Sequence, residues 1–221
     1  MRRRLRKEYK MKRWEIYVYA AAIVLLNIPL AFGGLFEELI FTSTSNWLQI
    51  ITHPFIHVSW YHLVLDASAF LVLYSQIAEP SRFRRTVYVV VCGLSSLLAA
   101  VIVLPKINSV GYCGLSGIGH GLMCICAMEM IFCTSAEKTN RMTGIILLLL
   151  LAAKCSLEAA TGKMFFDFMH SGLIGSPIAV AHAGGLIGGS LIFIIFNFER
   201  LKATAQLFAG EYQAAGRLGA K

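Results

Sequence analysis

Long apolar runs separated by short polar segments dominate the pattern along the chain. Most of these runs approach the ~20 residues that an α-helix needs to cross about 30 Å of hydrocarbon. Apolar and polar positions do not alternate with period two in any recurring way, which disfavours a β-barrel. The pattern predicts an all-α membrane protein with six spans, at roughly 15–35, 58–78, 86–104, 114–133, 143–160 and 178–198.

The composition agrees with this interpretation. Hydrophobic residues make up 57% of the 221 residues and charged residues only 14%, whereas a soluble domain is nearer half apolar and a quarter charged. We predict one membrane domain over 14–198, a basic cytoplasmic tail over 1–13 and a cytoplasmic C-terminal tail over 199–221.

The formal net charge of +8 invites a nucleic-acid interpretation, but the placement of the charges argues against it. A basic cluster precedes the first apolar run, and lysines and arginines recur in the 79–85 and 134–142 connections and after residue 198. The 36–57 segment has none. The positive-inside rule then places both termini in the cytoplasm, as an even number of spans also requires. The expected partner is a lipid bilayer, and no nucleic acid is expected.

This topology brings polar residues of three spans to one depth. The spans at 58–78, 114–133 and 178–198 all run inward, so their first turns lie together near the outer leaflet. His62 and Asp66 begin the first of these spans, Ser116 the second and His182 the third. Polar groups at that depth are costly in lipid unless they serve a purpose, which predicts a water-accessible site recessed from the outer surface.

Ser116 lies in the sequence Gly114-Leu115-Ser116-Gly117, where a loop of small residues enters a helix. Backbone N–H groups at a helix start lack intrahelical partners and can hold a developing oxyanion. The alternative is that Gly114 and Gly117 only permit close helix packing. His182 shares a helical stripe with Gly185 and Gly189, which would allow the close approach of a helix that carries the serine. A structural role for His182 is the alternative.

The other polar residues leave alternatives open. His62 could donate to an oxyanion, and Asp66 could do so if protonated or could fix the tautomer of His62. A metal site is an alternative, with His53, His57, His62 and Asp66 as ligands, but these residues lack a recognised ligand spacing. No metal and no cofactor are therefore expected. His53 and His57 are interpreted as outer-loop residues. Lys154 and Glu158 form an i,i+4 pair that is either a neutralised ion pair or a gate.

Taken together, these residues resemble the rhomboid intramembrane serine proteases across all six spans. The resemblance is carried by His57-Val-Ser-Trp-Tyr-His62-Leu-Val-Leu-Asp66, by Gly114-Leu-Ser116-Gly117 and by the stripe from His182 to Gly189. It implies a six-helix rhomboid-like bundle, with Ser116 as nucleophile, His182 as base and then acid, and His62 assisting the oxyanion.

The chain departs from the rhomboid pattern at two positions. Asp66 stands where rhomboids commonly have Asn, and His120 where they have an aromatic residue. An ionised Asp66 would repel an oxyanion. His120 could pack against His182 in the place of the aromatic residue, and its position near Ser116 also makes it an alternative candidate for the base.

Gly-Leu-Ser-Gly-x-x-His-Gly, together with Lys154 and Glu158, is similar to the rhombosortase branch of bacterial rhomboids. That resemblance implies single-span substrates with a C-terminal glycine motif, a sorting helix and a basic tail. It also implies location in a bacterial inner membrane, with the site on the periplasmic side. A non-catalytic rhomboid-like protein that binds membrane helices is the competing hypothesis. A transporter fits less well, because the charged residues cluster on one side.

Overall fold

The chain forms an all-helical bundle in the computed structural model. The structure describes residues 2–218 except 35, 43, 45, 105–106, 108–110, 133–137 and 166–177. Its long helices are α1 (Arg2–Leu26), α3 (Trp60–Gln76), α4 (Arg82–Val103), α6 (Ser116–Phe132), α7 (Lys138–Thr161) and α8 (Ala179–Leu218). Short helices η1 (Ile28–Phe32), η2 (Glu37–Leu39), α2 (Trp47–Thr52) and η3 (His53–Phe55) lie between α1 and α3.

These six long helices correspond in order to the six predicted spans. Four stretches are long and apolar enough to cross a membrane: Arg13–Phe32, Arg82–Val103, Thr139–Thr161 and Ala179–Lys202. A fifth is obtained if α2–η3 and α3, which meet at 91°, count as one span, and α6 is apolar but has only 17 residues. The predicted class, a helical membrane bundle, is confirmed.

Helix ends differ from the predicted spans in ways that the backbone explains. The first helix stops at Leu26 rather than near residue 35, because Pro29 and a left-handed Gly33 (φ 77°) hold the following residues in the 3-10 turn η1. At the other end of α1 the helix already begins at Arg2, within the basic segment. The last helix continues past residue 198, with a break at Asn197 (φ −121°, ψ 18°).

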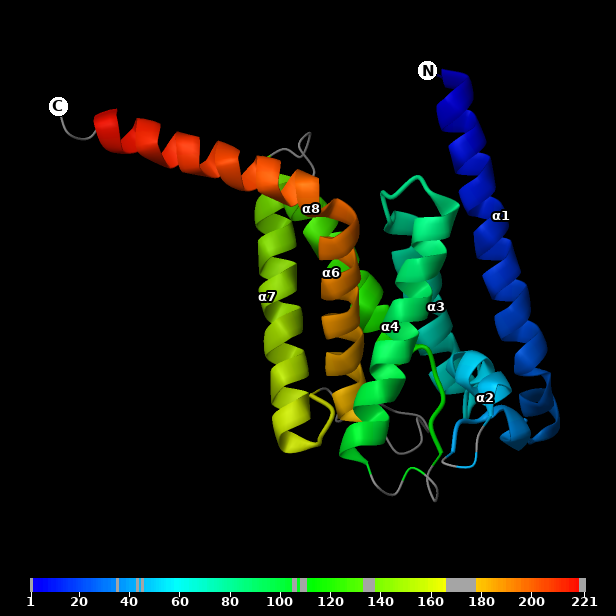
Figure 1. Cartoon of the computed structure of the whole chain (residues 1–221). Coiled ribbons are helices and arrows are strands. Elements are labelled where there is room, and N and C mark those ends of the chain that lie inside the picture. Colours follow the sequence, from blue (N-terminus) through cyan, green and yellow to red (C-terminus); the bar gives the residue numbers. More distant parts are fainter. Residues whose placement is uncertain are drawn as a thin grey trace.

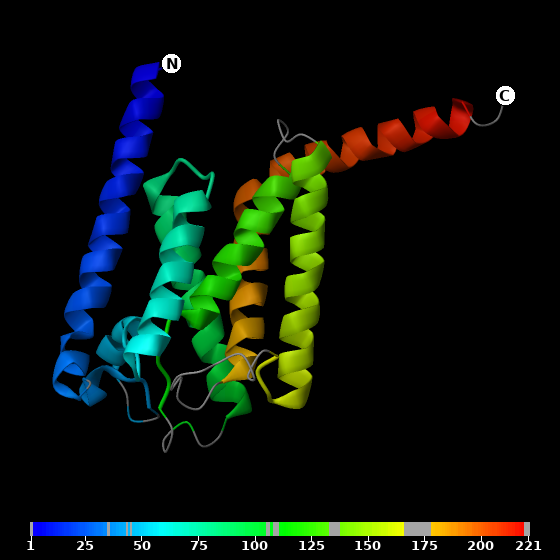
Figure 2. The ribbon, with the colours of Figure 1, turned by 180° about the vertical axis from the view of Figure 1, so that it is seen from behind.

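At the centre of the bundle, α8 packs against both α4 and α6, and α7 covers α6 and α8 (Figures 1 and 2). Glycines allow the backbones to approach closely. A Cβ added at Gly189 would lie 2.5 Å from the carbonyl oxygen of Gly121, and one at Gly185 would collide with the carbonyl of Gly117. Van der Waals packing between such surfaces is the main source of helix association in lipid, where burial of apolar area adds little.

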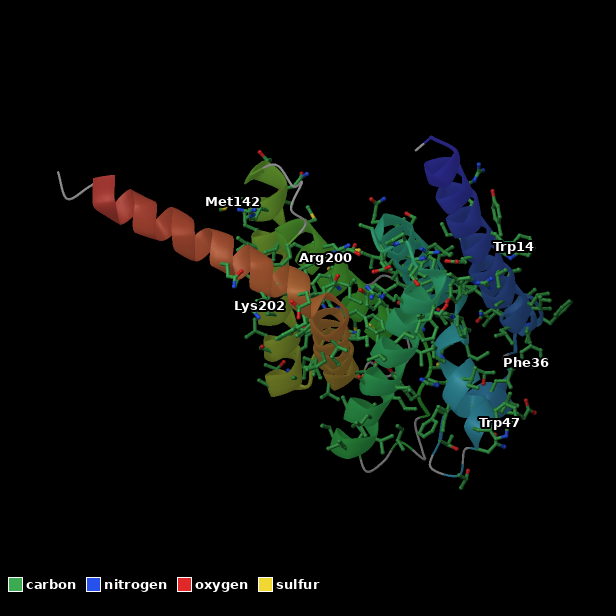
Figure 3. The ribbon with its side chains drawn as sticks, turned by 45° about the horizontal axis from the view of Figure 1, so that its top comes forward. Trp14, Phe36, Trp47, Met142, Arg200 and Lys202 are labelled. Atoms are coloured by element: carbon green, nitrogen blue, oxygen red, sulfur yellow. The ribbon has the colours of Figure 1, made fainter. Side chains whose placement is uncertain are left out.

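Both termini lie at the same end of the bundle, and past Asn197 α8 turns away from the bundle axis (Figure 1). Arg200 and Lys202 follow this turn, on the opposite side of the molecule from Trp14 and Trp47 (Figure 3). Both tryptophans are largely exposed, Trp14 on α1 and Trp47 on α2. Exposed tryptophans are typical of the interface between membrane and water.

Candidate active site

The loop that leads into Ser116 is fixed at several points. Phe41 and Tyr112 exchange two backbone hydrogen bonds (3.1 and 2.8 Å), and the Gly114 N–H donates to the His53 carbonyl (3.1 Å). The Tyr112 hydroxyl is hydrogen-bonded to the Ser96 hydroxyl of α4 at 2.6 Å. The segment between α1 and α3 therefore acts as a frame for the serine loop.

Gly114 has a backbone conformation that requires glycine. Its φ of 106° lies in a region that L-residues rarely adopt, and a Cβ there would lie 3.0 Å from the His62 ring and 3.1 Å from Asp66 Oδ2. After this turn Leu115 is fully buried and Ser116 starts α6. Gly114, two residues before the start of α6, therefore lies beside the His62 ring.

His120 connects the serine backbone to His182. Its Nδ1 donates to the Ser116 carbonyl oxygen at 2.7 Å, and its ring stacks on the His182 ring, with centroids 4.0 Å apart and planes inclined by 10°. Its Nε2 accepts a hydrogen bond from the Lys154 ammonium at 2.9 Å. Since both ring nitrogens are engaged, His120 is a stacking partner of the predicted base and is not itself free to act as a base.

His182 is hydrogen-bonded to Glu158 of α7. Its Nδ1 lies 2.7 Å from Glu158 Oε2, and both side chains are buried. A carboxylate can only accept, so Nδ1 carries the proton and Nε2 is left as the acceptor. Glu158 Oε1 also accepts from Lys154 Nζ at 2.7 Å and from the Phe165 N–H at 3.0 Å. The sequence predicted the Lys154–Glu158 pair but not its contact with His182.

Asp66 lies between two histidines. Its Oδ2 is 3.2 Å from His62 Nε2 and 3.5 Å from His57 Nε2, and the two rings are 5.0 Å apart, edge to face. His62 Nδ1 is buried and has no hydrogen-bond partner in the described part of the chain. Asp66 Oδ2 is likewise buried without a hydrogen bond in the described part of the chain, so its contact with the two rings is one of charge and proximity. Whether Asp66 fixes the orientation of His62 stays a prediction.

His53 and His57 lie in the segment between α1 and α3, and both are buried. Asn27 holds this segment, because its side chain donates to the Phe55 carbonyl at 2.6 Å and accepts from the His57 N–H at 2.9 Å. Burial lowers the pKa of His57 despite the neighbouring Asp66. A lone Asn between two apolar stretches gave no signal of this role.

One group of described side chains has the spacing of a metal site. His120, Glu158 and His182 each offer a ligand atom within 4.8 Å of the others. Lys154 argues against an ion there, since its ammonium already donates to His120 and Glu158 and supplies a positive charge. A divalent cation would have to displace that ammonium. The hydrogen-bonded network is the better interpretation of this group.

The structure thus places His62 and Asp66 of α3 beside Gly114, and it links the Ser116 carbonyl through His120 and His182 to Glu158 of α7. The predicted packing glycines, Gly185 and Gly189, lie at the contact between α6 and α8. Pro177, which precedes His182 in the sequence, lies outside the described residues.

Comparison with known proteins identifies the family of the chain. No curated protein and no solved structure matches the chain. The family model of the Rhomboid domain matches residues 44–198, which contain Ser116, His120, Glu158 and His182. Rhomboids are serine intramembrane proteases that act on transmembrane substrates within the bilayer. The chain is a member of the rhomboid family and an integral membrane protein.

Proposed function

We propose that this chain is an intramembrane serine endopeptidase in which Ser116 is the nucleophile and His182 the general base. The observation that carries the proposal is the stack of His182 on His120, which is itself hydrogen-bonded to the Ser116 carbonyl. This stack holds the base beside the first turn of α6, and Nε2 is the nitrogen left to accept a proton.

The reaction follows from these positions. Ser116 Oγ attacks the scissile carbonyl carbon as its proton passes to His182 Nε2. N–H groups at the start of α6 stabilise the oxyanion, and His62 adds a donor when it carries a proton on Nδ1. His182 then protonates the leaving amine and leaves an acyl-enzyme on Ser116. Water, activated by His182, hydrolyses the ester and restores the serine.

The proposed substrate class is a single-span membrane protein whose C-terminal sorting helix is preceded by a glycine motif. The resemblance to the rhombosortase branch supports this class. Glycines also lower the cost of unwinding a helix, and a peptide bond must leave the helix to reach the serine. A membrane reporter with the glycine motif should be cleaved, and a reporter with leucines in place of the motif should not. Equal cleavage of both reporters would contradict the proposed substrate specificity but not the proposed protease activity.

The proposed orientation places both termini in the cytoplasm and the site on the periplasmic side of a bacterial inner membrane. Basic residues at the end of the bundle that holds both termini support it, among them Arg200 and Lys202. Alkaline phosphatase fused after Leu104 should be active, because this position would lie on the periplasmic side. The same enzyme fused after Pro80, on the cytoplasmic side, should be inactive. The reverse pattern would contradict this orientation.

Labelling with a fluorophosphonate tests the nucleophile. The purified wild type should label covalently, Ser116→Ala should not, and His182→Ala should label far more slowly. Ser43→Ala provides a matched serine control that should label like the wild type. A wild type that does not label, or labelling that survives Ser116→Ala, would support the competing function, a rhomboid-like protein that binds membrane helices without cutting them.

A further inference from the structure

Beyond Ser116 and His182, one buried carboxylate lies in direct contact with the proposed base. Glu158 Oε2 is 2.7 Å from His182 Nδ1, on the side of the ring away from the nitrogen that would take the serine proton. Glu158 is 1% exposed and His182 4%, so water does not compete for this hydrogen bond. A buried carboxylate so placed holds the imidazole in one tautomer and stabilises the imidazolium that forms in the reaction.

Glu158 is itself held rigidly. Its second oxygen accepts from Lys154 Nζ (2.7 Å) and from the Phe165 N–H (3.0 Å). A carboxylate with three donors stays ionised and keeps one orientation. Lys154 also donates to His120 (2.9 Å), and the His120 ring stacks on the face of the His182 ring. The imidazole of His182 is therefore fixed at its edge by Glu158 and at its face by His120.

We propose that Glu158 is a positioning residue that completes a Ser116–His182–Glu158 triad, with Lys154 orienting its carboxylate. This inference rests on the proposed function, because it assigns Glu158 a role only if His182 is the base. It replaces the interpretation of Lys154 and Glu158 as a gate or an isolated ion pair. The proton moves between Ser116 and His182 alone, and Glu158 stays ionised throughout.

Three variants of this network separate positioning from mere stabilisation. Glu158→Gln should lower kcat by roughly 10² to 10⁴-fold with little change in KM, as expected when the carboxylate of a triad is made neutral. Glu158→Asp keeps the charge with a shorter reach and should recover part of that loss. Lys154→Met removes the ion pair but leaves the contact with His182, so it should lower kcat much less. Glu199→Gln, an exposed carboxylate elsewhere on α8, should match the wild type.

The split between kcat and KM gives a readout that a merely structural role would not produce. His182 contacts Glu158 and His120, and Lys154 contacts both of these residues. Thermal unfolding in detergent identifies variants that fail to fold. If Glu158→Gln is one of these, the shorter Glu158→Asp still tests the inference through kcat and KM.

The two proposals fail in different ways. If the wild type labels at Ser116 but folded Glu158→Gln keeps kcat within about twofold, the triad is wrong and the Ser–His dyad stands. The triad is also wrong if Lys154→Met and Glu158→Gln lose kcat equally, since that would indicate a shared structural role. If the wild type does not label at all, the proposed protease function itself is wrong.

Discussion

At the scale of single residues, Asp66 shows how a departure from the rhomboid pattern acquires a physical role. A carboxylate that faced the oxyanion would oppose catalysis. In the structure its Oδ2 instead lies between His62 and His57, at 3.2 and 3.5 Å. Asp66 thus faces the Nε2 side of the His62 ring, and Nδ1 is the ring nitrogen left without a partner among the described residues.

Substitution of Asp66 should therefore lower activity. Asn has no charge, so it would lose the attraction between the carboxylate and the two neighbouring histidine rings. We expect Asp66→Asn to lower kcat/KM by roughly tenfold, which corresponds to about 1.4 kcal/mol, and Asp66→Ala to lower it further. Cleavage of a membrane reporter measures both. Full or raised activity in Asp66→Asn would instead indicate that the side chain faces the oxyanion directly.

Residue patterns identified Ser116, His182, His62 and Asp66 as one group, because helix direction alone placed them at one depth. The contact between Glu158 and His182 could not be predicted in this way. An i,i+4 spacing predicts that Lys154 meets Glu158 on α7, but which neighbour α7 turns toward depends on packing between helices. The burial of His57 could not be predicted for the same reason, since its N–H donates to Asn27, 30 residues earlier.

At the scale of elements, the contact between α6 and α8 holds the serine and the histidine together. Gly117 and Gly121 on α6 face Gly185 and Gly189 on α8, and the backbones approach so closely that no Cβ fits between them. The sequence predicted the glycine stripe on α8. It could not show which helix the stripe faces, because small residues suit several partners equally well.

Gly185→Ala should force these helices apart. Its Cβ would overlap the Gly117 carbonyl, one residue from Ser116. We expect a loss of about 2 kcal/mol or more in the free energy of unfolding and a large loss of activity. Gly119→Ala is the control, because a Cβ there has no atom within 4 Å and alanine favours the helix. Thermal unfolding and reporter cleavage measure both, and equal behaviour of the two variants would contradict the close contact.

At the scale of the whole molecule, α1 lies outside the part of the chain that the Rhomboid domain model matches, residues 44–198. It is nevertheless joined to the bundle by a buried ion pair. Both Arg85 Nε and Nη2 donate to Glu15, at 2.9 and 2.8 Å, and the Tyr74 hydroxyl donates to Glu15 at 2.6 Å. These contacts connect α1 to α3 and α4, while Asn27 connects its other end to the frame of the site.

The attachment of α1 should depend on this pair. Glu15→Gln leaves Arg85 buried without its counter-charge, and breaking a buried pair in this way costs about 3–5 kcal/mol. Arg82→Gln removes only the exposed partner, 3.6 Å from Glu15, and should cost less than about 1 kcal/mol. Replacing both Glu15 and Arg85 with methionine should recover most of the loss, because no unpaired charge remains. Thermal unfolding in detergent measures all three.

Since the pair joins α1 to the bundle without touching Ser116 or His182, folded Glu15→Gln should cleave the reporter with unchanged kcat at low temperature. A fall in kcat without a fall in stability would show that α1 acts on the site directly.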